Sequence, residues 1–347
     1  MRRLTLVLAL AAATSSGAEL SWRAVWEWSL PKRTDADLVR LVESAQALGF
    51  NALLMSVPAG KEQFVADECH RRGMQLYLST VFTGGDPSWQ QALTPAQEAR
   101  LDLPLPADYQ HGGEPLTAEE VLQSPLPCWN RQEVHTLFAQ RVRRMAALPA
   151  DGLAFDCIGY RNYERCHCPT CDAGLRRARR TDPGMTVPRW AEDVLVSFTN
   201  EMAEVARAAR PLIGLTVHVY PVFAPNPYYG HRLNLHYTGE TVSWFFHPHW
   251  PLTKVEARLQ RVLQRQRSVW PDQTAAPFIG FDARQLRHYR STRRVVQELE
   301  AVQQSGASAL QMAELGYLLD KPLVAQAVAE KLGGSYRAHW RQPGGRP

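Results

Sequence analysis

Short apolar runs alternate with amphipathic helical patterns along most of the chain. Each apolar run has the length of a strand, and the run is followed by a stripe of apolar residues at helical spacing that ends near Gly or Pro. The predicted strands are Trp22–Leu30, Asn51–Val57, Met74–Phe82, Gly152–Tyr160, Ile213–Pro221, Thr241–Pro248, Phe278–Ala283 and Ala309–Gly316. The predicted helices include Asp35–Leu48, a helix that Asn130 caps, Ala191–Ala209, a helix that Thr253 caps, Thr292–Gln304 and Pro322–Leu332.

Alternating strands and helices favour an α/β fold with a parallel sheet, and this number of units favours closure into a (β/α)8 TIM barrel. An open doubly wound sheet is the alternative, but no G-x-G-x-x-G motif follows the first predicted strand. We expect a single domain over residues 19–340. The segment Thr83–Pro127 lacks a clear period and is interpreted as an elaborated loop after strand three, and residues 341–347 as a flexible tail.

The N-terminal residues have the pattern of a cleavable export signal. Arg2 and Arg3 precede an apolar run from Leu4 to Ala13, and small residues follow at 16–18. The run of about ten residues is too short for a membrane span, which needs about 20. We therefore predict a signal peptide over residues 1–18 and a secreted or periplasmic protein without stable membrane insertion after cleavage. A retained N-terminal anchor is the alternative.

Composition and charge exclude some classes of partner. With 45% hydrophobic and 21% charged residues, the chain can bury a large core. The net charge of +5 is spread over Arg-bearing helices, such as those with Arg143 and Arg176. A nucleic-acid interface needs a concentrated basic stripe within a known module, so we expect none here.

Polar residues gather where the predicted strands end. In a parallel barrel these ends meet around one rim, where active sites form. The carboxylates there suit glycosidic hydrolysis, in which one acid protonates the leaving oxygen while a second carboxylate attacks the anomeric carbon or activates water. Asp156 is the first catalytic candidate, and Glu314 and Asp282 compete as its partner. The remaining rim candidates would bind a carbohydrate substrate: Glu27, Trp28, His218, Tyr220, His247, His249 and Trp250.

Two alternatives to a glycoside hydrolase remain open. A metal-dependent hydrolase or deacetylase would use His218, His247 and His249 as ligands. A non-catalytic carbohydrate-binding barrel would lack a partner carboxylate close to Asp156.

A cysteine cluster follows the fourth predicted strand. Cys166, Cys168 and Cys171 lie within six residues, and Cys128 is the best fourth metal ligand, with His167 in reserve. These thiols favour a structural zinc site, and a disulfide with spare thiols is the alternative that export would support. No organic cofactor is expected. Cys157 and Cys69 are interpreted as buried small side chains, with Cys157 facing the helix layer.

The C-x-C-x-x-C loop, with one cysteine upstream, resembles the loop of zinc-binding β-galactosidases built on (β/α)8 barrels and of exported glycoside-hydrolase-like barrels. The specific likeness covers about Cys128–Leu175. It implies a glycosidase fold and a structural zinc ion. The β-galactosidases carry Asn-Glu at the end of strand four and a Glu on strand seven, whereas this chain has Asp156-Cys157 and Asp282, so the resemblance does not imply galactosidase activity.

Overall fold

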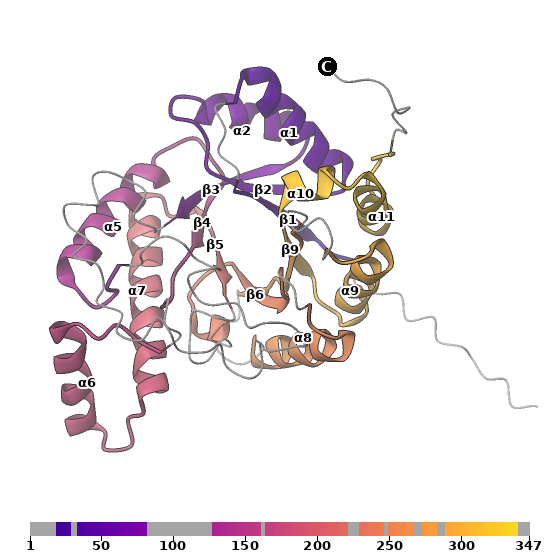
Figure 1. Ribbon diagram of the computed structural model, residues 1–347. Coiled ribbons are helices and arrows are strands. Elements are labelled where there is room, and N and C mark those ends of the chain that lie inside the picture. Colours follow the sequence, from indigo (N-terminus) through magenta and orange to yellow (C-terminus); the bar gives the residue numbers. More distant parts are fainter. Residues whose placement is uncertain are drawn as a thin grey trace, which may run out of the picture.

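Parallel strands form a closed barrel in the computed structural model (Figure 1). The structure describes residues 19–28, 33–81, 127–160, 164–220, 229–245, 249–266, 273–282 and 289–338. The strands are β1 (Trp22–Glu27), β2 (Ala52–Met55), β3 (Gln75–Val81), β4 (Gly152–Asp156), β5 (Gly214–Val219), β6 (Tyr237–Ser243), β7 (Thr274–Ala275), β8 (Phe278–Gly280) and β9 (Ala309–Ala313). Pairing of β5 with β6 closes the ring, and β7 and β8 both pair with β6 as two pieces of one barrel strand. The predicted (β/α)8 barrel is therefore confirmed.

Helices surround the barrel, as Figure 1 shows. They are α1 (Asp35–Ala47), α2 (Glu62–Arg71), α5 (Gln132–Ala146), α6 (Pro169–Thr181), α7 (Val187–Ala209), α8 (Leu252–Gln266), α9 (Thr292–Gln304), α10 (Leu315–Leu319) and α11 (Pro322–Leu332), with a 3-10 turn η2 (Gly230–Arg232). Their apolar stripes face the strands, as Leu38, Val42 and Ala45 do on α1. The first turn of α1 is held by a capping box between Thr34 and Asp37.

Large side chains fill the lower barrel in layers. Trp22 on β1 stacks on Tyr237 on β6 at 3.8 Å between ring centroids and meets Tyr77 on β3 edge-on. Gly152 and Gly214 leave room for this plug, because an added Cβ at either position would lie within 2.6 Å of the Tyr77 ring or hydroxyl. The barrel is therefore packed at the amino ends of its strands. An active site is expected at the opposite rim, where the carboxyl ends of the strands lie.

A buried amide satisfies the polar groups of the next layer. Gln311 on β9 accepts a hydrogen bond from the Trp26 indole at 2.8 Å and donates one to the Thr216 hydroxyl at 2.7 Å. A Cβ at Gly239 on β6 would lie 2.4 Å from the Gln311 side-chain oxygen. This need for space explains the glycine in β6. With Thr238 and Glu240 on either side of it, the first half of the strand has few apolar residues.

Several predicted boundaries are wrong. The sixth strand begins at Tyr237, not at Thr241, because its polar first half hides the strand pattern. The N-cap of α5 is Arg131, not Asn130, and Thr253 lies inside α8, which begins at Leu252. The start of α7 is Val187, where Thr186 caps the helix, rather than Ala191. The helices α9 and α11 have the predicted bounds.

Several predictions concern residues outside the described part of the chain. These are the signal peptide over residues 1–18, residues 83–126 of the loop after strand three, and the tail over residues 341–347. Among the described residues, no helix combines the length and the apolar character that a membrane span needs.

Glu240 on β6 generates a testable prediction about stability. Its carboxyl is fully buried on the outer side of the strand and accepts a hydrogen bond from the Gly230 amide at 3.0 Å. Burial raises the pKa of Glu240 to about 7, although the Gly230 amide and Arg258 oppose the rise. The unfolded chain releases this proton near pH 4.5. The free energy of unfolding is therefore expected to fall between about pH 4.5 and pH 7 by roughly 3 kcal/mol through this group.

We predict that Glu240→Gln removes this fall, because the amide keeps the acceptor for Gly230 but cannot ionise. Relative to the unaltered protein, the variant should gain stability between pH 5 and pH 8 in urea unfolding. The same substitution at the exposed Glu256 on α8 is the control. Parallel pH profiles for the unaltered and Glu240→Gln proteins would show that Glu240 does not carry the effect.

Candidate functional site

Four buried carboxylates lie at the carboxyl ends of barrel strands. Asp156 is the last residue of β4, whereas Glu27 ends β1, Glu314 follows β9 and Asp282 lies two residues after β8. Each is at most 5% exposed. Since β4 and β9 stand half a turn apart in the ring of strands, Asp156 lies across the barrel from Glu314. The rim thus carries acids on two opposing sides, an arrangement typical of barrel active sites.

Glu27 and Glu314 are neighbours on one side of the rim. The register pairs Trp26 with Ala313, so the two carboxylates follow paired positions. Oxygens of both lie 3.6 to 4.0 Å from the place where a Cβ at Gly316 would stand. Glu27 also forms an ion pair with Arg33 at 2.8 Å and accepts a hydrogen bond from the Gly316 amide at 3.0 Å. The positive charge of Arg33 reduces the repulsion between the two neighbouring carboxylates.

Asp156 on the other side is held by its own turn and by β5. Its Oδ1 accepts a hydrogen bond from the Cys157 amide at 2.9 Å and lies 3.6 Å from Nδ1 of His218. Cys157 has a left-handed backbone with φ of 58°. This conformation breaks the strand alternation and places the Cys157 Sγ 4.0 Å from the Tyr220 hydroxyl. The prediction that Cys157 faces the helix layer is therefore wrong, although the side chain is buried as expected.

His218 occupies a cage of rings beneath the rim. It stacks on Phe278 at 3.8 Å between centroids and lies 3.9 Å from Tyr220 and 5.9 Å from Trp28. Burial lowers the pKa of His218, and Asp156 partly offsets this. Burial, with help from the Asp156 charge, also raises the pKa of Tyr220 far above its usual range. Both side chains therefore favour their neutral forms when considered alone.

The other predicted binding residues fall into two groups. Trp28, Tyr220 and His249 are only partly buried, whereas Trp250 is buried and receives Lys254 and Arg258 over its ring at 4.4 and 4.6 Å. His247 lies outside the described residues. The residues at this rim that the sequence gives no reason to select are Arg33 and Cys157. An arginine six residues after Glu27 has no distinctive pattern, and the left-handed turn at Cys157 is set by the fold.

The four predicted metal ligands converge. The Sγ atoms of Cys128, Cys166, Cys168 and Cys171 all lie within 4.8 Å of one another. Cys128 Sγ is 3.5 Å from that of Cys168 and 3.4 Å from that of Cys171. Thiolates around a tetrahedral zinc ion are about 3.8 Å apart, whereas a disulfide needs about 2.05 Å. All six cysteines are free thiols, so this geometry matches a metal site better than a bridge.

Hydrogen bonds among the thiols set their acidity without a metal. Contacts with Cys166 and Cys171 lower the pKa of Cys128 to about 5, against the effect of burial. Contacts with Cys128 and Cys166 raise the pKa of Cys171 far above its usual range. The thiol of Cys128 is therefore the first of the cluster to ionise, and a cation at the centre would allow more of them to do so. Among the described residues, no other group of His, Cys, Asp and Glu has metal-ligand spacing.

The cysteine cluster supports the turn that follows Asp156. Trp129, next to Cys128, donates its indole hydrogen bond to the Gly159 carbonyl at 2.6 Å. Tyr160 is buried beside the cluster, whose sulfur atoms contribute to the rise in its pKa, and it donates to the Ala191 carbonyl on α7 at 3.1 Å. Holding the ends of this turn keeps the Asp156 backbone in place.

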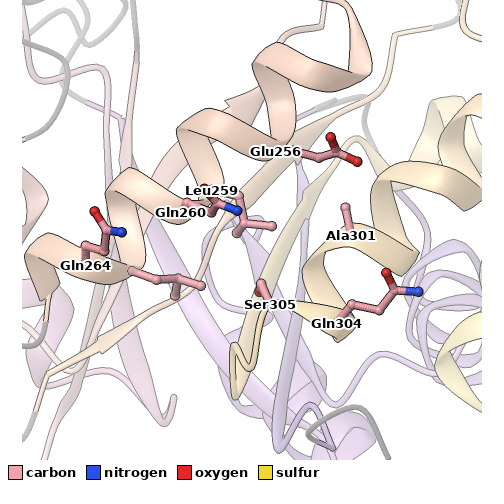
Figure 2. Close-up of a pocket in the computed structure, with 8 residues that line it drawn as sticks. Glu256, Leu259, Gln260, Gln264, Ala301, Gln304 and Ser305 are labelled. Atoms are coloured by element: carbon pink, nitrogen blue, oxygen red, sulfur yellow. The ribbon is translucent and has the colours of Figure 1, made fainter. Parts of the chain in front are cut away.

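A groove of about 600 Å³ lies away from this rim, between α8 and α9. Figure 2 shows Gln260, Gln264 and Gln304 along it, with Leu259 and Ala301 between the helices. Ser305, which also lines it, ends α9 just before β9 begins. The groove therefore lies between two helices of the outer layer, and we do not assign it to the candidate site.

Comparison with solved structures places the fold among glycoside hydrolase barrels. A cold-adapted β-galactosidase from Rahnella sp. R3 superposes with a TM-score of 0.59 at 14% identity, over 92% of this chain and 56% of that chain. The glycoside hydrolase domain of PgaB (BpsB) from Bordetella bronchiseptica has a TM-score of 0.57 at 13% identity, over 92% of this chain and 99% of that domain. A GH42 β-galactosidase from G. stearothermophilus has a TM-score of 0.56 at 13% identity, over 92% and 57% of the two chains.

These likenesses define the class of fold. This chain spans little more than half the length of the two β-galactosidases and nearly the whole of the PgaB domain. At such low identity the likeness extends to the fold alone. No family model matches the sequence, and no curated protein matches it. The protein is therefore a (β/α)8 barrel of the kind seen in glycoside hydrolases, with four cysteines close enough to hold a metal ion.

We predict that the purified protein binds one thiophilic divalent ion at the cysteine cluster. Cobalt added to the metal-free protein should give the intense sulfur-to-cobalt charge-transfer absorption of a four-thiolate site, and Cys128→Ser should weaken binding and lower the melting temperature. The control is Cys69→Ser, because this buried thiol lies on α2 outside the cluster. A metal-free protein whose mass shows the loss of hydrogens through disulfide formation would contradict the metal site.

Proposed function

We propose that the protein is an exported glycoside hydrolase that cleaves a carbohydrate at the carboxyl rim of its barrel. The observation that carries the proposal is the pair of opposing acidic sides on this rim: Asp156 on β4 faces the side that carries Glu314 and Asp282. A sugar ring between two such sides can be protonated from one and attacked from the other. The signal-like pattern of residues 1–18 supports export.

In the proposed reaction the bond from the anomeric carbon to the glycosidic oxygen breaks. One carboxylic acid gives its proton to the departing oxygen. A carboxylate on the other side either bonds to the anomeric carbon or removes a proton from an attacking water. In both cases the hydroxyl group of a water molecule is finally bonded to the anomeric carbon. Asp156 is one member of this pair, and Glu314 or Asp282 is the other. The Arg33 ion pair gives Glu27 an assisting role, as a fixed charge beside Glu314.

Sugar binding is proposed for the accessible side chains of the rim. Trp28, Tyr220 and His249 are partly exposed and combine flat rings with polar atoms, which suits the C–H faces and hydroxyls of a sugar. Trp250 packs against side chains from the first two turns of α8, so we propose that it supports this surface from behind. His247 stays in the proposal as a residue of the same segment.

We propose zinc as the ion of the cysteine cluster. Four sulfur donors with separations close to those of a tetrahedral site suit zinc, and a fully ligated ion leaves no position for substrate. Its role is structural: Cys128 and the Cys166–Cys171 loop hold the turn after Asp156. A His-centred metal hydrolase is less well supported, because among the described residues, which include His218 and His249, only the cysteine cluster has metal-ligand spacing.

The test is a panel of aryl glycosides and polysaccharides with the purified mature protein. With substrates whose leaving group is unactivated, such as polysaccharides, Asp156→Asn and one of Glu314→Gln or Asp282→Asn should each lower kcat/KM by about a thousandfold or more, since each removes one half of the acid and nucleophile pair. The third variant should lose much less activity, which identifies the partner. Metal content, measured on the same samples, should be unchanged.

Glu240→Gln is the matched control, because it alters an equally buried carboxylate on the outer side of β6, which has no role in the proposed reaction. Sugar binding without hydrolysis by any sample would instead favour a carbohydrate-binding barrel. Activity that survives in Asp156→Asn with every substrate would overturn the proposal.

A further inference from the structure

The hydrogen bonds around His218 fix which of its nitrogens carries a proton. The Thr241 hydroxyl lies 3.1 Å from the Val219 carbonyl, which can only accept, so the hydroxyl donates its single proton there. The same hydroxyl lies 3.0 Å from Nε2 of His218 and must accept the hydrogen bond from it. Nε2 of His218 is therefore protonated.

The other nitrogen of His218 is buried, has no hydrogen-bond partner among the described residues and faces Asp156. Nδ1 lies 3.6 Å from Oδ1 of Asp156, and both side chains are almost completely buried. If His218 were neutral and Asp156 ionised, a lone pair would face a carboxylate in a site with little water to screen the repulsion. One proton between the two atoms removes this repulsion, and a small approach of the side chains turns the contact into a hydrogen bond, as catalytic contacts often do when substrate binds.

We propose that His218 and Asp156 hold one proton between them, and that Asp156 is consequently the proton donor of the hydrolytic pair. This inference rests on the proposed function and deepens it, because the attacking or water-activating carboxylate is then on the opposite side of the rim. His218 is a positioning residue: it does not touch the sugar but keeps a proton available to the carboxyl that does. When Asp156 gives its proton to the glycosidic oxygen, it becomes a carboxylate that the next water can reprotonate.

The titratable groups that face the pair carry no charge. Among the described residues, the titratable neighbours are Cys157 and Tyr220, and burial raises the pKa of both so that they stay neutral. His218 also contacts the rings of Trp26, Trp28, Phe245 and Phe278. The aromatic surroundings also tolerate a cationic imidazole, so the proton can reside on either partner.

The direct test is nitrogen NMR of the full chain labelled with 15N-histidine. The signals of His218 are assigned by their loss in His218→Gln. Near pH 6 the unaltered protein should show an Nδ1 that is protonated or that accepts a strong hydrogen bond. In Asp156→Ala this nitrogen should move to the position of an unprotonated, unbonded imidazole nitrogen, while Nε2 stays protonated. Glu27→Gln should leave both signals unchanged. An Nδ1 signal that is unbonded already in the unaltered protein, and equal in Asp156→Ala, would overturn the proposal.

Leaving-group dependence provides an independent test once a hydrolysed glycoside is known. The leaving group of a dinitrophenyl glycoside departs with little protonation, so the kcat/KM of Asp156→Asn should fall about tenfold or less with it and about a thousandfold with an unactivated alkyl glycoside.

In His218→Gln the basic limb of the kcat/KM profile should move down by at least one pH unit, because glutamine keeps a donor for Thr241 but cannot hold the proton. Equal losses with both glycosides would make Asp156 the nucleophile instead. If no glycoside is hydrolysed, the proposed function fails, while the NMR result still decides whether the proton is shared.

Discussion

Pairing of β5 with β6 closes the sheet, and the arrangement of the candidate site depends on this closure. In an open sheet the ends of β4 and β9 would lie at separate places along one edge. In the ring they stand across from each other, so that Asp156 and Glu314 border the same opening. Closure also creates an interior that excludes water, and its polar groups must be satisfied there. Gln311 does so for Trp26 and Thr216, and Thr241 does so for His218.

The cysteine cluster stabilises the part of the rim that carries Asp156. The turn after Asp156 contains the left-handed Cys157, which β-structure alone does not stabilise. Trp129 holds the Gly159 carbonyl from one side, and Tyr160 ties the end of the turn to α7. The four sulfur atoms converge next to these two residues, because Cys128 precedes Trp129 and Tyr160 is buried beside the cluster. A metal ion there would fix the turn without taking part in the reaction, because a four-thiolate site has no open position.

Much of the architecture can be predicted from the sequence because its signals are local. The apolar stripes of α9 and α11, with their caps, determine their bounds, and the repeated strand and helix pattern indicates the barrel. The beginning of β6 cannot be predicted in this way, since Gly239 is there to make room for Gln311 from a strand more than 60 positions away. The spacing of the cysteines predicts their convergence, because three of them lie in one short loop. The pair of Glu27 with Arg33 and the turn at Cys157 arise from tertiary contacts and backbone geometry, for which the sequence has no pattern.

The most direct test of the central claim, that this rim handles carbohydrate, is a crystal structure of Asp156→Asn with the best oligosaccharide substrate of the unaltered protein. The account predicts a glycosidic oxygen beside residue 156 and an anomeric carbon facing Glu314 or Asp282, with sugar rings over Trp28 or Tyr220. An oligosaccharide bound at another surface, such as the groove between α8 and α9, with the rim free of sugar, would contradict it.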